Sequence, residues 1–270
     1  MQISFSQLIS TQQKKQQQPC AITNSTQGIG ESIVNILLKN NASKVVAVAR
    51  SQEALEALQS THGQERFQFI AGDVTDPETS KKAVELAISK FGQLNSVIAN
   101  AGVLDPVGLL DQTSIDGWKK LYDINLFSVV QLLQVALPEL RKTKGNVVAV
   151  SSGAATTAYS GWSAYGSSKA ALNHLIFSLA SDEAEVLGIQ AISVAPGVVA
   201  TSMQKDIREK FGTNMTRDAL QRFVDLHENS QLAHPDEPGT VLANLALKGW
   251  LKELNGKFIR YNDDVMKDYQ

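Results

Sequence analysis

The sequence has a single cysteine and almost no net charge. Cys20 stands alone among 270 residues, so the chain cannot form an intrachain disulfide or a cysteine-based zinc site. This argues against a disulfide-stapled secreted protein and predicts a reducing compartment, the cytoplasm. The 25 basic and 27 acidic residues leave a formal charge of −2, which disfavours binding to nucleic acid through bulk charge. The four histidines show no metal-ligand spacing, and we expect no metal.

Long apolar runs are also missing. None approaches the ~20 residues that span a bilayer, so we expect no membrane contact. Residues 1–18 hold seven glutamines, two lysines and no acid. They lack the apolar centre of a secretory signal, and no arginine before Arg50 supports a mitochondrial address. We expect a disordered polar tail, because this segment buries too little apolar surface to offset its ordering entropy; a weak targeting role is the alternative.

Short apolar runs alternate with longer amphipathic stretches over residues 19–270, which we expect to form one domain. Most of the short runs are rich in valine and isoleucine, as in strands buried on both faces. The runs are Cys20–Thr23, Val45–Ala49, Phe67–Ala71, Val97–Ala99, Val147–Val150, Ile189–Val194 and Phe258–Ile259. Helical periodicity is found at Ile29–Leu37, at Val84–Phe91, at about Ser163–Leu187, and at about Ile115–Leu137, which we expect to end before Pro138.

This alternation predicts an α/β fold. Right-handed crossovers between parallel strands give a three-layer, Rossmann-like, doubly wound sheet of about seven strands with helices on both faces. Ligands in such sheets bind at the carboxyl ends of the strands, near the switch in strand order. Residues just after each short run are therefore the candidates for chemistry.

A glycine-rich turn follows the first predicted strand. Gly28 and Gly30 would let the backbone approach a pyrophosphate, which would then lie at the N-terminus of the next helix. The two glycines alone are equally typical of an ordinary strand-to-helix turn. Their place between a strand and an amphipathic helix favours a dinucleotide.

Arg50 and Ser51 follow the second predicted strand. No acid occurs at 45–51 to bind a free ribose, whereas Arg50 can bind a 2′-phosphate with its fork of N–H donors. This favours NADP(H) over NAD(H), the alternative being a solvated arginine in a loop.

The third and fourth predicted strands also end in candidate residues. Asp73, before Val74, could accept from an adenine amino group or cap a helix, although Asp76 before Pro77 is the better cap. After the fourth strand, the asparagine of Asn100-Ala101-Gly102 can bridge neighbouring strands, and its glycine leaves room for a ribose.

Ser151 and Ser152 end the fifth predicted strand, and Tyr165 and Lys169 lie on the helix that follows. Residues four apart share a helix face, so the ammonium group can lie near the phenol. A nearby cation would lower the pKa of the phenol and make it a usable proton donor. The pattern Tyr-x-x-x-Lys is common by chance, and its value depends on the motifs around it.

Together these motifs resemble the short-chain dehydrogenase/reductase family. The likeness covers nearly all of residues 19–262, from the glycine turn through Asp73, Asn100-Ala101-Gly102, Asn125, Ser152, Tyr165-x-x-x-Lys169 and Pro196-Gly197. Within the family, 161–174 (GWSAYGSSKAALNH), 203–209 (MQKDIRE), 254–256 and 260–263 are similar to fungal NADPH-dependent benzil reductases of the (S)-benzoin-forming type, relatives of sepiapterin reductase.

The resemblance implies a role for each matching position. Tyr165 would donate the proton, Ser152 would hold the carbonyl oxygen, Lys169 would lower the Tyr165 pKa and bind the nicotinamide ribose, and Asn125 would hold a water that refills the relay. The remaining candidates line the cofactor, with Val199 and Thr201 at the nicotinamide amide and phosphate. The full cofactor-binding set is Asn24, Gln27, Gly28, Ile29, Gly30, Arg50, Ser51, Asp73, Val74, Asn100, Ala101, Gly102, Tyr165, Lys169, Pro196, Gly197, Val199 and Thr201.

Two positions depart from the family pattern. Asn24 stands where the first glycine of the turn is usual, but asparagine tolerates a positive φ better than other residues, so the turn could survive with some loss of cofactor affinity. Gln27 stands where NADP-preferring members often have a basic residue, so the cofactor preference depends mainly on Arg50.

Substrate clues are thinner. Tyr159 and Trp162 could form an aromatic wall for an aryl ketone or simply pack in the core. The stretch from Thr201 to about His227 fits either a mobile amphipathic lid or a surface helical pair. The resemblance also implies a homodimer or homotetramer built on the helices near 115–137 and 163–187.

The sequence thus predicts an NADPH/NADP+-dependent carbonyl reductase that transfers hydride to a ketone, an α-diketone such as benzil. One alternative is a non-catalytic dinucleotide-binding protein, which the set Asn125, Ser152, Tyr165 and Lys169 argues against. Another is a reductase or dehydrogenase for a different carbonyl or sugar alcohol. A sugar-nucleotide epimerase or dehydratase also uses Tyr-x-x-x-Lys, but its glycine turn is spaced differently and its substrate region is larger.

Overall fold

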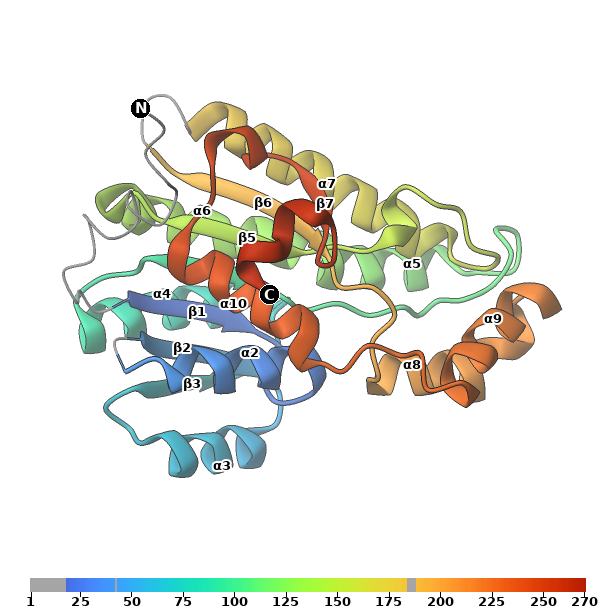
Figure 1. The fold of residues 1–270 in the computed structure, drawn as a ribbon, viewed down its shortest axis with the longest axis horizontal. Coiled ribbons are helices and arrows are strands. Elements are labelled where there is room, and N and C mark those ends of the chain that lie inside the picture. The colour runs from blue at the N-terminus through green and yellow to red at the C-terminus, as the bar shows by residue number, and fades with distance from the viewer. Residues whose placement is uncertain (1–17, 42, 184–187) are drawn as a thin grey trace.

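Seven parallel strands form the centre of the molecule in the computed structural model, which describes residues 18–41, 43–183 and 188–270. The strands lie in the order β3-β2-β1-β4-β5-β6-β7, so the direction of winding reverses between β1 and β4 (Figure 1). This confirms the predicted doubly wound α/β sheet. Their bounds are β1 Gln18–Thr23, β2 Ser43–Ala49, β3 Phe67–Ala71, β4 Ser96–Ala99, β5 Asn146–Val150, β6 Gln190–Ala195 and β7 Phe258–Arg260.

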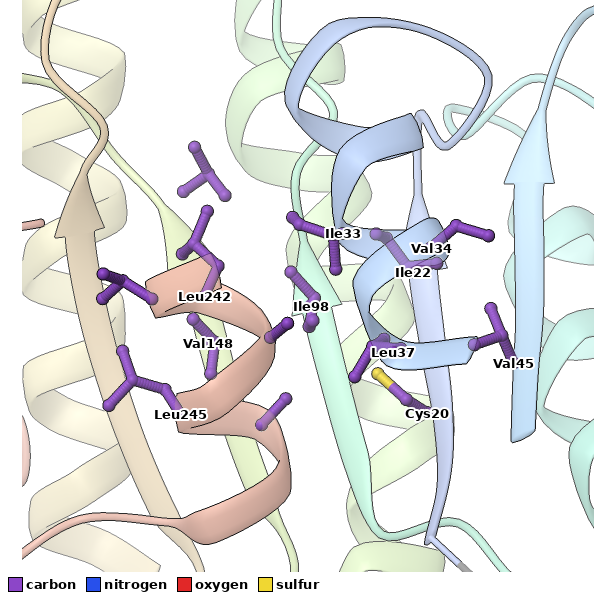
Figure 2. Close-up of a cluster of buried hydrophobic side chains, with 14 of the residues drawn as sticks. Cys20, Ile22, Ile33, Val34, Leu37, Val45, Ile98, Val148, Leu242 and Leu245 are labelled. Atoms are coloured by element: carbon purple, nitrogen blue, oxygen red, sulfur yellow. The ribbon is translucent and has the colours of Figure 1, made fainter. Parts of the chain in front are cut away.

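One face of the sheet is covered by α2 (Gly28–Lys39), α3 (Gln52–His62) and α10 (Asp236–Lys248). Figure 2 shows Ile33 and Leu37 of α2 and Leu242 of α10 directed towards strand residues such as Ile98. These side chains are fully buried, and each buried branched aliphatic chain contributes ~1.5–3 kcal/mol through the hydrophobic effect.

The opposite face packs against α4 (Pro77–Phe91), α6 (Ser128–Thr143) and α7 (Ser163–Glu183). Asp76 caps α4 by accepting from Glu78 N, with Pro77 in the first turn, as the sequence indicated. Because both faces are covered, the strands are rich in valine and isoleucine rather than alternating with polar residues. The alternating sequence pattern therefore encodes three layers.

The predicted helix end before Pro138 is wrong. The helix runs through α5 (Ile115–Tyr122), a π-helical turn η1 (Asp123–Phe127) and α6, with Pro138 inside α6. An interior proline costs ~3 kcal/mol or more. The last turn offsets this cost, because Leu140 is fully buried and Arg141 pairs with Glu183 of α7. By length and composition the 29 residues from Ile115 could cross a membrane, but their apolar side packs on the sheet.

A smaller helical unit lies beyond the carboxyl ends of the strands, on the right of Figure 1. It consists of α8 (Ser202–Asp206), the π-helical turn η3 (Ile207–Phe211), the 3-10 turn η4 (Gly212–Asn214) and α9 (Arg217–Glu228). A third apolar cluster lies beneath it and includes Trp162, Tyr165 and Phe223. We call residues 201–228 the lid segment. Three further 3-10 turns are η2 (Gly153–Ala155), η5 (Lys252–Leu254) and η6 (Asp264–Tyr269).

Two predicted boundaries shift or fall outside the described residues. Gln18 belongs to the predicted tail, but it begins β1 and pairs with Ser43 of β2, because the parallel ladder begins two residues before the apolar run at Cys20. Residues 1–17, the rest of the predicted tail, lie outside the described ranges. Helix α7 is described to Glu183, and the predicted end at Leu187 lies outside them as well.

Candidate active site

The turn after β1 has the backbone shape that a phosphate-binding loop needs. Asn24 and Gly28 both have φ of +54°. The asparagine thus adopts the left-handed conformation that its side chain was expected to tolerate. A Cβ on Gly30 would lie 1.9 Å from Asn24 O, which only glycine can avoid. Gln27, at the N-cap of α2, makes no side-chain cap hydrogen bond within the described structure. The first amides of α2 are therefore available to an anion.

Asn100 ties the turn to the neighbouring strand. Its Nδ2 donates to Thr23 O at 3.2 Å and to Asn24 O at 3.0 Å, and its backbone N–H donates to Thr23 Oγ1. This confirms the predicted bridge between strands. Because β1 and β4 meet where the winding reverses, Asn100 fixes the geometry of the turn at the switch point.

A cavity of about 400 Å³ opens above the carboxyl ends of the strands. Most of the predicted cofactor residues line it: Asn24, Gln27, Gly28, Ile29, Gly30, Arg50, Asp73, Val74, Asn100, Ala101, Gly102, Tyr165, Lys169, Pro196 and Thr201. Five predicted site residues are not part of its wall: Ser51, Asn125, Ser152, Gly197 and Val199. Ser51 instead caps α3 by accepting from Ala54 N.

The roof of the cavity comes from the segment for which the sequence left open a lid or a surface helical pair, and its position over the cavity fits the lid; its lining residues were not among the predicted site residues. Met203, Asp206, Lys210 and Phe211 of the lid segment line it, together with Leu104 from the segment after β4. Only Met203 and Phe211 carried a sequence signal, as apolar residues among charges. The others are ordinary polar or apolar residues whose position depends on how the lid segment folds back over the sheet.

Lys169 is buried beside the floor of the cavity. Its Nζ donates to Val150 O at 2.9 Å and lies 5.9 Å from the centre of the Tyr165 ring. A Cβ on Gly102 would lie 3.2 Å from this nitrogen, so the glycine leaves room for the lysine. Burial lowers the Lys169 pKa to about 8, because the charged form loses hydration. Lys169 can therefore exchange its proton near neutral pH.

The pKa of Tyr165 departs from the sequence expectation. Burial raises it above its ordinary value, and a hydrogen bond with the Ser152 side chain lowers it only in part. The sequence predicts a lowering by Lys169, but loss of hydration of the phenolate is the dominant effect on this pKa. The phenol is consequently protonated at neutral pH, the state in which it can donate.

Asn125 is fully buried in the π-helical turn η1, and its side chain is committed to the protein. Nδ2 donates to Val103 O at 2.9 Å and to Ser168 Oγ at 3.1 Å, while Oδ1 accepts from Val103 N at 2.8 Å. Asn125 thus fixes the segment after β4 against α7. The water-holding role that the family resemblance implies stays a prediction, and the amide group has little capacity left for it.

The opposite end of the cavity carries Arg50 and Asp73. Asp73 Oδ1 accepts from the backbone N–H and the hydroxyl of Thr75, and these bonds, with Arg50 and Lys120 nearby, hold the pKa of the carboxyl below its usual range. Arg50 and Lys210 line the cavity and form no ion pair with any residue in the described ranges. They are available to an anionic ligand.

A nicotinamide dinucleotide fits this site on the structure's own evidence. Gly30 allows the Asn24 carbonyl and Asn100 Nδ2 to approach the backbone closely, which shapes the turn, and both Gly28 and Gly30 line the cavity. Ser151 belongs to the cavity wall, and its buried Oγ has no hydrogen-bond partner among the described residues. A glycine turn at the switch point and a Tyr–Lys pair beside it define a dinucleotide-dependent oxidoreductase of the doubly wound class.

Comparison with known proteins identifies the family. The model of the short chain dehydrogenase family matches residues 19–212, and the chain belongs to this family. It is 46% identical to the oxidoreductase YIR035C of Saccharomyces cerevisiae, over 92% of this chain and 97% of the relative. It is 43% identical to the benzil reductase ((S)-benzoin forming) IRC24 of the same yeast, with the same coverage of both chains.

Solved structures agree with the fold. The crystal structure of YIR035C from S. cerevisiae superposes with a TM-score of 0.91 at 44% identity, covering 94% of this chain and 99% of the other. The KRED1-Pglu enzyme gives 0.86 at 51% identity, covering 89% and 99%. ElxO, solved with NADP bound, gives 0.74 at 26% identity, covering 90% and 96%.

Proposed function

We propose that the protein is an NADPH-dependent carbonyl reductase that reduces a ketone, specifically an α-diketone such as benzil, to the hydroxyketone. The observation that carries this proposal is the shared cavity. The glycine turn after β1, Arg50 and the pair Tyr165–Lys169 all line one space. A cofactor and a small carbonyl compound can therefore meet beside a protonated phenol.

In this proposal the nicotinamide cofactor supplies the hydride, and the chain supplies position and a proton. The Tyr165 hydroxyl donates to the carbonyl oxygen as negative charge develops there, and Ser152, hydrogen-bonded to the phenol, holds the same oxygen. Lys169, with a pKa of about 8, returns a proton to the phenolate. Asn100, Gly28 and Gly30 hold the turn against the cofactor phosphates.

The preference for NADPH follows from charge at the end of β2. Arg50 has no ion-pair partner in the described structure and lines the cavity, where a 2′-phosphate would accept its N–H donors. The NADP-bound structure of ElxO, a relative at 26% identity, supports the same cofactor. An acid in place of Arg50 would favour the free ribose instead.

The substrate class is supported by the roof of the cavity. Leu104, Met203 and Phe211 give it an apolar lining that suits aryl groups, and a relative at 43% identity is a benzil reductase. Tyr159 and Trp162 do not line the cavity; they pack against each other with ring centres 5.0 Å apart. The core-packing interpretation of these two residues is the one that fits the structure.

Oxidation of NADPH, followed by absorbance with benzil, other 1,2-diketones, simple aldehydes, sugars and sepiapterin, tests the proposal. We expect benzil to be reduced and NADH to be a poorer donor. Tyr165→Phe should keep NADPH binding and lose at least ~10²-fold in kcat, the lower range for a general acid. Stoichiometric NADPH binding without turnover of any carbonyl would favour a non-catalytic dinucleotide-binding protein, and turnover retained in Tyr165→Phe would refute the assigned role.

We also propose a cytoplasmic homodimer or homotetramer. A neighbour with a TM-score of 0.80 and 44% identity is described as a cytoplasmic protein of S. cerevisiae. Phe127 and Phe177, on the two long helical segments named in the sequence analysis, are about half exposed and would be covered by a second copy. Size-exclusion chromatography with light scattering tests the assembly, and a monomeric mass would refute it.

A further inference from the structure

The lid segment is connected to the catalytic phenol by a continuous stack of aromatic rings. Trp162, one residue before α7 begins, meets Tyr165 edge-to-face, with ring centres 5.7 Å apart and planes at 87°. Phe223 of α9 stacks on Trp162 at 5.3 Å and 19°. All three rings are at least nine-tenths buried, so none can turn without moving its neighbour.

Arg222 of α9 is exposed and contacts the outer end of this row of rings. Its Nη1 donates to the Tyr159 hydroxyl at 3.1 Å, and its guanidinium lies 5.4 Å from the Tyr159 ring and 6.0 Å from the Phe223 ring. Tyr159 in turn packs on Trp162. Arg222 and Phe223 therefore hold α9 against residues 159–162, which lead into α7, the helix that carries Tyr165.

The lid segment also lines the cavity on its other side. Met203 and Phe211 face the space where the carbonyl compound would lie, and two polar contacts anchor the segment near its middle. Asn214 Nδ2 donates to Val107 O at 3.0 Å, and Thr216 N donates to Ser160 Oγ at 3.0 Å. One segment thus touches both the cavity and the ring stack that supports Tyr165.

From this arrangement we propose that Phe223 is a positioning residue for Tyr165. It acts through Trp162, so that docking of α9 sets the orientation of the phenol for proton transfer. The inference rests on the proposed reductase function and adds a residue to it. The family match ends at residue 212, before α9 begins, so this support comes from a part of the chain beyond that match.

A purely structural role makes a different prediction. If Phe223 only fills the third apolar cluster, its loss lowers the melting temperature and leaves kcat of the folded enzyme unchanged. If it orients Tyr165, kcat falls while the KM for NADPH is kept, because Gly28, Gly30 and Arg50 line the cavity whereas Trp162 and Phe223 do not. Proton transfer then also limits the rate more strongly, and the solvent isotope effect on kcat rises.

Phe223→Leu is the central variant, since leucine keeps an apolar side chain and removes the ring. We expect kcat with the preferred diketone to fall by about tenfold to a hundredfold, the range for a misplaced catalytic group, with the KM for NADPH within about twofold. Phe223→Tyr keeps the ring and should retain kcat within about threefold of the parent. Phe91→Leu, the same exchange at a buried ring that belongs neither to the stack nor to the cavity wall, is the matched control and should leave kcat unchanged.

Arg222→Met provides a second route, because Arg222 is exposed and its replacement leaves the core intact. It should lower kcat less than Phe223→Leu but raise the solvent isotope effect in the same direction. An unchanged kcat and isotope effect in folded Phe223→Leu, or an equal loss in Phe223→Tyr, would overturn the inference. Should Phe223→Leu fail to fold, unchanged kinetics in Arg222→Met would overturn it. If the parent protein reduces no carbonyl, the proposed function fails before Phe223 is tested.

Discussion

Replacing Gly30 by alanine tests whether the turn after β1 depends on the close approach of the Asn24 carbonyl group to Gly30. The added Cβ would lie 1.9 Å from Asn24 O and 2.8 Å from Asn100 Nδ2, whereas ordinary contacts of a Cβ begin at 3.4 Å. The Asn24 carbonyl must therefore move by about 1.5 Å. That movement breaks the hydrogen bond from Asn100 Nδ2, which is 3.0 Å long in the parent protein.

The magnitude follows from two costs. Insertion of a methyl group into packed surroundings destabilises by ~1–3 kcal/mol, and loss of one hydrogen bond adds ~1 kcal/mol. We expect the free energy of unfolding to fall by ~2–4 kcal/mol as these costs combine. Because the displaced carbonyl belongs to the phosphate-binding turn, the dissociation constant for NADPH should also rise by about tenfold or more, equivalent to ~1.4 kcal/mol.

Urea unfolding and fluorescence titration with NADPH measure the two effects separately. Gly63→Ala is the matched control: among the described residues nothing lies within 4 Å of the added Cβ, while the φ of +81° makes alanine strained. The control should lose ~1 kcal/mol of stability through this strain and keep its affinity for NADPH. The reasoning is refuted if Gly30→Ala binds NADPH as tightly as the parent, or if Gly63→Ala loses affinity equally.

Three other predictions concern single side chains. Arg50→Asp should lower kcat/KM for NADPH by at least about tenfold and leave kcat/KM for NADH within about threefold. The reason is that the variant replaces a cation that would bind the 2′-phosphate by a carboxylate that repels it. An unchanged preference for NADPH in steady-state kinetics would remove Arg50 from the cofactor assignment. Asn24→Gly should have a dissociation constant for NADPH within about threefold of that of the parent. Asn24→Ala should lose ~1 kcal/mol of stability in chemical denaturation, because alanine is strained at the φ of +54° found at this position. An alanine variant as stable as the parent would contradict this. Lys169→Met tests the pH dependence of stability. In the folded protein the Lys169 pKa is about 8, below the ordinary 10.5, so between these pH values the unfolded chain binds more protons than the folded one. The free energy of unfolding of the parent should therefore rise with pH by up to ~1.4 kcal/mol per pH unit relative to that of the variant. Parallel stability curves for parent and variant between pH 8 and 10 would show that the Lys169 pKa is not depressed.

The strands and the shape of the turn after β1 could be predicted because their signals are local. Each of the seven strands contains a short apolar run that is visible in the sequence, and their bounds shift by at most two residues. The behaviour of Asn24 follows from its own side chain, and the bridging role of Asn100 follows from its position after a strand in a parallel sheet. Parallel sheets bring the carboxyl ends of their strands to one edge, so residues far apart in sequence could be grouped correctly.

What could not be predicted depends on tertiary packing. Pro138 normally ends a helix, but the burial of Leu140 and the pairing of Arg141 with Glu183 involve partners distant in the sequence. The sequence left open whether residues 201–227 form a lid or a surface helical pair, because the side chains that face the cavity are set by how this segment folds back over the sheet. Lys210 in particular carries no signal that separates it from a solvated surface lysine, and only its position over the cavity makes it a candidate ligand for an anion.

The Tyr165 pKa shows how packing can reverse a chemical expectation. The four-residue spacing on one helix face correctly predicted that Lys169 lies beside the Tyr165 ring. If the nearby cation acted alone, the pKa of the phenol would fall. Burial acts on both groups at once: it depresses the pKa of the lysine to about 8 and raises that of the phenol. The result suits reduction, because an acid that stays protonated at neutral pH can donate to a developing alkoxide. Oxidation of an alcohol would instead require the phenolate as base, a state that the same burial disfavours.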